Sequence, residues 1–192
     1  MKKKNPIFFM PIGIPSSGKS TIRTQILKKY PKLCVISPDE IRFQLLDYEH
    51  TKKDFDPEIE PQVWAKAKLQ LNQCIENTQD IFFDATNVDK KGRTDLLHQL
   101  SPNYIKKAIY IQIEPELAIL RQKKRERQVP EKIIYDKYNN LQLPTLDEFD
   151  SIDIVSQQAS KQECEDLNIQ FKEKLTSIFD DKKKQCKICK DI

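Results

Sequence analysis

Residues 13–20 read Gly13-Ile14-Pro15-Ser16-Ser17-Gly18-Lys19-Ser20, and this stretch decides the fold. It follows the apolar run Ile7-Phe8-Phe9-Met10 and precedes a stretch with a helical pattern, so it lies where a strand passes into a helix. Two of the three glycines of the chain, Gly13 and Gly18, fall inside it and give the backbone the freedom to curl. Main-chain N–H groups that converge in such a curl bind phosphate oxygens, so the sequence predicts a phosphate-binding P-loop.

The P-loop predicts a site for ATP and a magnesium ion. Lys19 is placed to reach the outer phosphates, and the hydroxyl of Ser20 is placed to bind Mg²⁺. The residues expected to contact the nucleotide all lie in or directly after the loop: Gly13, Pro15, Ser16, Ser17, Gly18, Lys19, Ser20 and Thr21.

The length and charge of the chain suit one domain. Its 192 residues are enough to bury a core without disulfides or metals. The formal net charge is +4 and 32% of the residues are charged, a mildly basic balance that is compatible with a phosphate-rich substrate. No apolar run approaches the length that crosses a membrane, so we expect a soluble, cytoplasmic protein without a membrane partner. The sequence predicts no oligomeric state.

The five cysteines are odd in number and scattered along the chain. This pattern is typical of free thiols in a reducing compartment. Cys186 and Cys189 form a lone C-x-x-C pair, which lacks the two further ligands of a zinc site and is expected in a loose tail.

Short apolar runs that alternate with helical patterns predict an α/β fold with a doubly wound, mostly parallel five-stranded sheet, as in P-loop NTPases of the kinase type. The expected strands cover residues 7–12, 33–36, 81–83, 108–113 and 152–155. The expected helices cover residues 19–29, 38–46, 58–76, 91–100, 115–127 and 130–141. We expect a single domain over residues 1–180, a helical lid at about 115–141, and a charged tail at 181–192.

Two apolar stripes are assigned to packing. On the helix at 58–76, Trp64, Leu69, Leu71 and Ile75 are expected in the core. A last amphipathic helix at 161–179 is expected to close the fold with one apolar face made of Leu167, Phe171, Leu175 and Ile178.

The stretch Ser37-Pro38-Asp39-Glu40-Ile41-Arg42 follows the second expected strand. Its serine and glutamate form a capping box and its proline suits the first helical position, so a helix begins at the carboxyl end of a strand, where ligands bind in such sheets. Asp39 and Arg42 lie three residues apart and share one face of the first turn. In isolation they would be a dipole-complementing carboxylate and a solvated charge. Beside a P-loop, Asp39 can accept the proton of an incoming hydroxyl and Arg42 can neutralise the transferred phosphoryl group.

Asp84-Ala85-Thr86-Asn87 follows the third expected strand. A carboxylate that ends a strand next to a P-loop can hold Mg²⁺ directly or through water, and Asp84 is our candidate. Two alternatives are that Asp84 contacts the acceptor, or that the D-x-x-N pattern only forms a turn.

Residues 123–127, Lys-Lys-Arg-Glu-Arg, place four cations between two expected helices. For any one of them a solvated position at a helix end is the simpler interpretation. Together they indicate a lid that closes over ATP, excludes water and brings an arginine to the γ-phosphate. Arg125 and Arg127 are the candidates.

Four motifs occur in this order along the chain: G-I-P-S-S-G-K-S, S-P-D-E-I-R, F-F-D-A-T-N and R-x-R-x-V-P-E. Over residues 6–156 the chain thereby resembles the P-loop kinases of the bacteriophage-type polynucleotide kinase superfamily. The resemblance implies transfer of the γ-phosphate of ATP to the 5′-hydroxyl of DNA or RNA. It implies roles for Lys19 and Ser20 at the phosphates and Mg²⁺, for Asp39 as general base, for Arg42 as a clamp on the acceptor or scissile phosphate, for Asp84 in organising the site and for Arg125 as the lid arginine.

Other functions are open from the sequence. The same motifs occur in kinases of small metabolites, nucleosides or aminoacylated tRNA. A nucleotide-driven ATPase or switch without an acceptor is less favoured, because the chain has no N-K-x-D guanine-reading motif. A non-catalytic nucleic-acid-binding module would need basic and aromatic residues interleaved on one face, and no such stripe is present.

Overall fold

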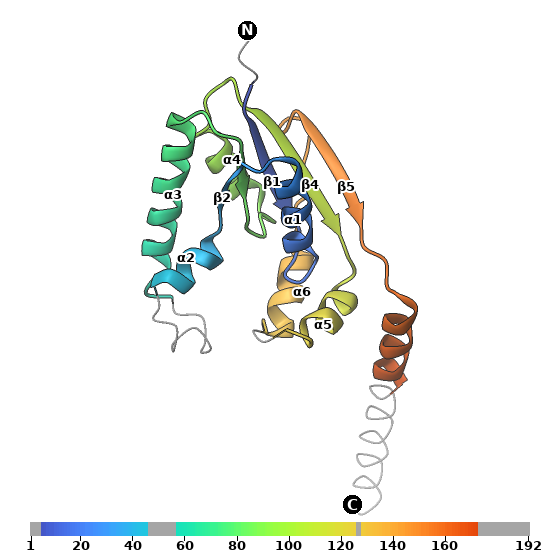
Figure 1. Cartoon of the computed structure of the whole chain (residues 1–192). Coiled ribbons are helices and arrows are strands. Elements are labelled where there is room, and N and C mark those ends of the chain that lie inside the picture. The colour runs from blue at the N-terminus through green and yellow to red at the C-terminus, as the bar shows by residue number, and fades with distance from the viewer. Residues whose placement is uncertain (1–4, 46–56, 126–127, 173–192) are drawn as a thin grey trace, which may run out of the picture.

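The computed structural model describes residues 5–45, 57–125 and 128–172. Its sheet has the strand order β2-β3-β1-β4-β5, and every pair of neighbours is parallel. The strands are β1 (Ile7–Ile12), β2 (Cys34–Ile36), β3 (Ile81–Phe83), β4 (Ile105–Gln112) and β5 (Ser151–Ser156). Figure 1 shows this sheet with its strands pointing toward one edge, which is the edge that carries the P-loop. The predicted five-stranded α/β fold is confirmed.

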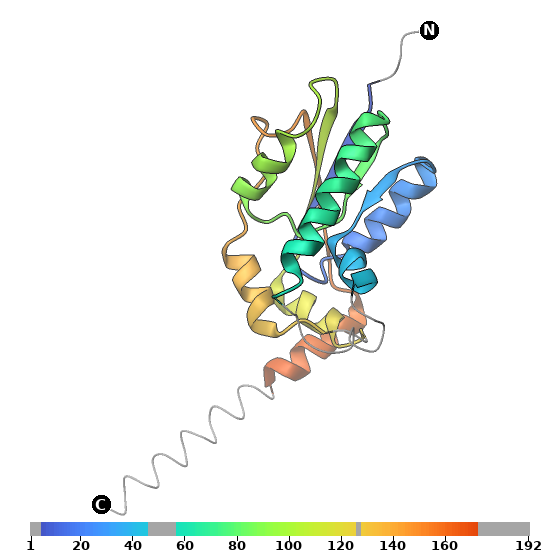
Figure 2. The same ribbon diagram turned by 90° about the vertical axis from the view of Figure 1, so that its left-hand side faces the viewer.

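Helices cover both faces of the sheet (Figure 2). They are α1 (Lys19–Lys29), α2 (Pro38–Leu45), α3 (Glu60–Glu76), α4 (Lys90–Leu97), α5 (Pro115–Gln122) and α6 (Glu131–Asn139), and residues 161–172 are also helical. Alternate residues of β1 face opposite ways, as the period of two in a strand requires. Phe8 and Met10 lie in a core with α2, α3 and α4, whereas Phe9 lies in a second core against α1.

Two element boundaries differ from the sequence prediction. β4 begins three residues early, at Ile105, because it pairs with β1 from Ile7 onward. The helix expected to run to residue 127 ends at Gln122. The side chain of Gln122 accepts from the Val129 N–H at 3.0 Å and donates to the Val129 carbonyl at 2.5 Å. These two bonds join the end of α5 to the start of the next segment.

The expectation of free thiols is wrong for two of the five cysteines. Cys34 at the start of β2 and Cys74 near the end of α3 form a disulfide, with Cα atoms 6.5 Å apart. They pair because α3 packs against the edge strand β2. Cys164 is free and exposed, and Cys186 and Cys189 lie outside the described residues. The argument from free thiols to a reducing compartment therefore loses its basis.

The expected apolar stripe of α3 is only partly buried. Leu71 is 1% exposed and Ile75 packs against the core, as predicted. Trp64 and Leu69 are 47% and 57% exposed, so their assignment to the core is wrong. Leu69 faces away from the stripe, and Trp64 lies toward the end of the helix that extends past the core.

The last helix also packs less than expected. Leu167 contacts the cluster around α5 and α6, but Phe171 is 64% exposed. Leu175, Ile178 and the expected tail at 181–192 lie outside the described residues. Among the helices that the structure describes, none is long and apolar enough to span a membrane.

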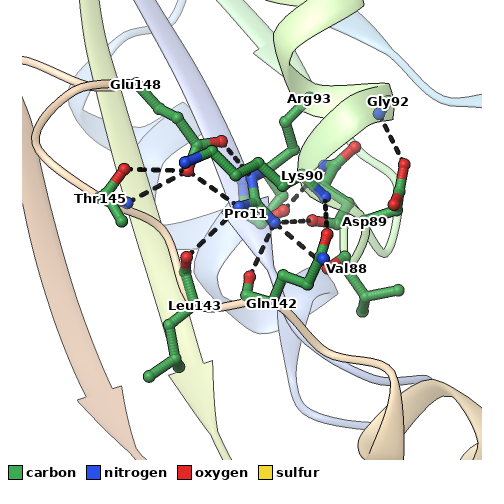
Figure 3. A network of polar contacts seen from close by, with 11 residues as sticks. Pro11, Val88, Asp89, Lys90, Gly92, Arg93, Gln142, Leu143, Thr145 and Glu148 are labelled. Carbon is green, nitrogen blue, oxygen red and sulfur yellow. Dashed lines mark hydrogen bonds and ion pairs between the residues drawn. The ribbon is translucent and has the colours of Figure 1, made fainter.

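A buried ion pair that the sequence did not point to joins α4 to the segment before β5. The Nε of Arg93 lies 2.8 Å from Oε1 of Glu148, and their side chains are 0% and 4% exposed. Arg93 also donates to the carbonyls of Asn87, Val88, Gln142 and Leu143, as Figure 3 shows in part. Burial alone would raise the pKa of Glu148, but the hydrogen bonds and charge of Arg93 outweigh it and hold that pKa below its usual value.

We expect Arg93→Met to lower the free energy of unfolding by about 3–5 kcal/mol, because it leaves a buried carboxylate without its partner. Urea denaturation at pH 7 measures this. Since the folded pKa of Glu148 lies below the unfolded value, the stabilisation is complete above that value and is lost as the pH falls through the folded pKa. Glu148→Gln should flatten this acid dependence. A loss under about 1 kcal/mol in Arg93→Met would contradict the assignment.

Candidate active site

The P-loop leaves the end of β1 and closes at the first turn of α1. Gly18 caps α1 with a φ of 100°, a left-handed conformation that glycine adopts without strain. Ser16 is also left-handed, with a φ of 61°. The Gly13 N–H donates to the Thr86 carbonyl at 3.0 Å, which ties the start of the loop to the turn after β3.

Gly13 is required for space. A Cβ on this residue would lie 2.8 Å from the Ser17 hydroxyl and 3.1 Å from the Ile111 carbonyl. The Ser17 hydroxyl is buried and has no hydrogen-bond partner among the described residues. A buried donor without a partner costs free energy, so this hydroxyl is suited to a ligand oxygen inside the loop.

Lys19 lies in the first turn of α1 and folds back over the loop. Its ammonium donates to the carbonyls of Gly13 at 2.9 Å and Ile14 at 2.7 Å. Burial lowers the pKa of Lys19 to about 8, against the opposing charges of Asp84 and Asp39. The positive charge of Arg125 lowers it further. The charges of two candidate carboxylates and one candidate lid arginine therefore all act on this ammonium.

Asp39 and Arg42 lie on one face of α2, as predicted. Arg42 forms an ion pair with Asp39 and a second one with Glu60 of α3, at 2.6 Å. The Asp39 side chain is 72% exposed, whereas that of Arg42 is 10% exposed. Arg42 thus holds an accessible carboxylate in place at the start of α2. The serine half of the expected capping box is present, because Ser37 Oγ accepts from the Glu40 N–H at 3.3 Å.

Asp84 follows β3, beside the strand that carries the P-loop. One of its carboxylate oxygens lies 3.0 Å from Arg23, and Arg23 also binds Glu40 at 2.6 Å. Burial raises the pKa of Asp84, while the charges of Arg23 and Lys19 oppose the shift. Sequence analysis missed Arg23. Its position four residues after Lys19, on the same side of α1, was the available signal.

The donors present fit a magnesium ion. Magnesium prefers oxygen ligands, one or two from the protein and the rest from water and phosphate. Ser20 in the first turn of α1 and Asp84 at the end of β3 are the predicted protein ligands. Among the residues that the structure describes, no three histidine, cysteine or acidic side chains form a metal cluster. The site therefore suits an ion that is also bound by a nucleotide.

A cavity of about 490 Å³ lies next to the P-loop, between α1, the end of β5 and the segment after α5. The residues that line it are Ser16, Gly18, Thr21, Ile22, Gln25, Arg121, Arg125, Val155 and Gln157. Of the two predicted lid arginines, Arg125 borders this cavity, and Arg127 lies outside the described residues. Its position beside the loop suits the nucleoside part of a bound nucleotide.

Arg121 is a second residue of this cavity that the sequence did not single out. It donates to Gln157 at 2.9 Å and pairs with Glu163 at 2.9 Å. The hydrogen bonds from Arg121 lower the pKa of Glu163 to about 2. No sequence motif marks Arg121, because its partners lie more than thirty residues away in the chain.

A protein-family model with the description "AAA domain" matches residues 8–144. The chain belongs to this family. The match begins in β1 and runs past α6, so it contains the P-loop, Asp39, Asp84 and Arg125. No curated protein matches the chain.

Solved structures of kinases share the fold of this AAA-domain chain. A chain of the Pnkp1/Rnl/Hen1 RNA repair complex is 18% identical with a TM-score of 0.63, covering 73% of this chain and 45% of that one. A fungal RNA kinase is 15% identical with a TM-score of 0.55, covering 89% and 44%. A gluconokinase from Sinorhizobium meliloti 1021 is 12% identical with a TM-score of 0.52, covering 91% and 98%. The chain thus spans less than half of the first two.

The lowered pKa of Lys19 predicts how nucleotide affinity depends on pH. Phosphate oxygens favour the charged ammonium, so binding takes up a proton once the pH exceeds about 8. We expect the dissociation constant of a fluorescent ATP analogue with Mg²⁺ to rise by up to about tenfold per pH unit above that pH. Anisotropy titrations from pH 7.5 to 9.5 measure this. An affinity that stays constant across the range would show that Lys19 is already fully charged without nucleotide.

Proposed function

We propose that this chain is a kinase that transfers the γ-phosphate of ATP, with Mg²⁺, to the 5′-hydroxyl end of a polynucleotide. The observation that carries the proposal is the charge arrangement around Lys19. The P-loop ammonium lies within electrostatic reach of Asp39, Asp84 and Arg125 at one edge of the sheet. A donor phosphate held by the loop would therefore have a carboxylate on the acceptor side and an arginine on the nucleotide side.

The proposed chemistry is positioning together with charge neutralisation. The P-loop N–H groups and Lys19 bind the β- and γ-phosphates, and Ser20 and Asp84 hold the magnesium ion, which neutralises charge that develops on the phosphates. Asp39 accepts the proton of the attacking hydroxyl, since its carboxylate is exposed and oriented. Arg125 approaches the transferred phosphoryl group from the cavity side.

The role of Arg42 in this proposal is narrower than the resemblance implies. Its guanidinium is already bound by Glu60 and Asp39, and the residue is 8% exposed. These contacts favour Arg42 as the group that positions Asp39. The alternative role, as a clamp on an acceptor phosphate, would require it to leave Glu60.

The acceptor class is the part of the proposal that rests most on likeness. The order of the four motifs resembles polynucleotide kinases, and RNA kinase and RNA repair structures share the fold. The gluconokinase structure favours a second candidate, a kinase of a small hydroxylated metabolite. Labelled ATP offered with a 5′-hydroxyl oligonucleotide and with a panel of sugars and nucleosides separates the two. Phosphate release with no labelled acceptor would indicate an ATPase or switch.

Asp39→Asn should lower kcat for oligonucleotide phosphorylation by about a hundredfold or more, because it removes the proton acceptor. The affinity for ATP should stay within about twofold, since Asp39 lies on the acceptor side. Asp95→Asn, at an exposed position on α4, is the matched control and should keep full activity. Near wild-type turnover in Asp39→Asn would remove this carboxylate from the mechanism.

A further inference from the structure

One side of α3 is apolar along the helix and changes environment halfway. Trp64, Leu71 and Ile75 are spaced by seven and four residues, so they lie on the same side. Leu71 is 1% exposed and Ile75 packs against the core, but Trp64 is 47% exposed. The stripe therefore continues beyond the part of the helix that the core covers.

The exposed part of the stripe lies at the edge of the sheet that carries the candidate active site. The end of α3 leads into the start of β3, so the first turns of α3 lie at the carboxyl end of the parallel strands (Figure 1). Glu60, one turn before Trp64, binds Arg42, and Arg42 binds Asp39. A chain of two ion pairs thus connects the turn before Trp64 to the proposed general base.

We propose that Trp64 stacks on a nucleobase of the acceptor strand, close to its 5′ end. This inference rests on the proposed polynucleotide kinase function. An indole is a large flat apolar surface, and base stacking on aromatic side chains is the usual way in which proteins bind single strands without reading their sequence. Lys68 is exposed and lies four residues after Trp64, on the same side of α3, where it offers a positive charge to the strand's phosphates.

The stacking surface and the general base then act on one acceptor. Asp39 binds the terminal hydroxyl, and Trp64 holds a base of the same strand. Stacking is tolerant of sequence because every base has a flat face. The inference therefore predicts an enzyme with weak base preference and a clear preference for strands over single nucleosides.

Trp64 is the only tryptophan of the chain, so its fluorescence reports on this position alone. Titration with a 5′-hydroxyl oligonucleotide should quench it, and the quenching should weaken when the terminal nucleotides are abasic. Trp64→Ala should raise KM for the oligonucleotide by about tenfold or more with kcat within about twofold, the effect of losing one stacked base. Trp64→Phe should restore most of the affinity, because it keeps an aromatic face.

Leu69→Ala is the matched control, because Leu69 is an equally exposed apolar residue on the other side of α3. It should leave KM and kcat unchanged. If the wild-type chain phosphorylates oligonucleotides and Trp64→Ala does so with the same KM, the stacking inference fails while the proposed function stands. If the wild-type chain neither phosphorylates oligonucleotides nor shows quenching by them, both fail. A change of oligomeric state in Trp64→Ala, measured by sedimentation, would also overturn the inference, since it would assign Trp64 to a contact between copies.

Discussion

The site depends on the tie between the end of β1 and the turn after β3. The Gly13 N–H donates to the Thr86 carbonyl at 3.0 Å, and the Asn87 side chain donates to the Pro11 carbonyl at 2.8 Å. Asn87 has a φ of 50°, a left-handed conformation that asparagine tolerates better than most residues. These two bonds fix the P-loop against the turn that carries Asp84. Parallel pairing of β1 with β3 makes the tie possible, because it brings both carboxyl ends to the same edge.

This tie is supported from behind by the buried Arg93. Its guanidinium donates to the Asn87 carbonyl at 3.1 Å, and it is anchored by Glu148. Glu148 also accepts from the N–H and hydroxyl of Thr145. The turn behind the P-loop is thereby joined to the segment that follows α6. A rigid support of this kind suits a reaction in which the protein mainly positions and neutralises charge.

Much of the fold could be predicted from the sequence because its signals are local. Glycine placement marked the P-loop, and the bounds of β1, α1 and β3 follow directly from apolar runs and their breakers. The stretch at 37–42 placed Asp39 and Arg42 correctly on one helical face, since their spacing alone determines it. The assigned chemical roles of these residues stay predictions.

The rest depends on contacts between residues far apart in the chain. The Cys34–Cys74 disulfide, the Arg93–Glu148 pair and the bonds of Arg121 each join residues thirty or more positions apart, and none leaves a spacing pattern. Arg23 was overlooked because its partners, Glu40 and Asp84, come from two other elements. Trp64 was assigned to the core because helical periodicity gives the side of a helix and not how far the core extends along it. Isothermal titration calorimetry with Mg²⁺ and a non-hydrolysable ATP analogue tests the central claim, that the P-loop binds a magnesium nucleotide through Lys19, most directly. The account predicts one site per chain and at least about tenfold weaker binding by Lys19→Ala, the loss of a strong charge-assisted contact; no binding by the wild-type chain, or equal binding by both, would contradict it.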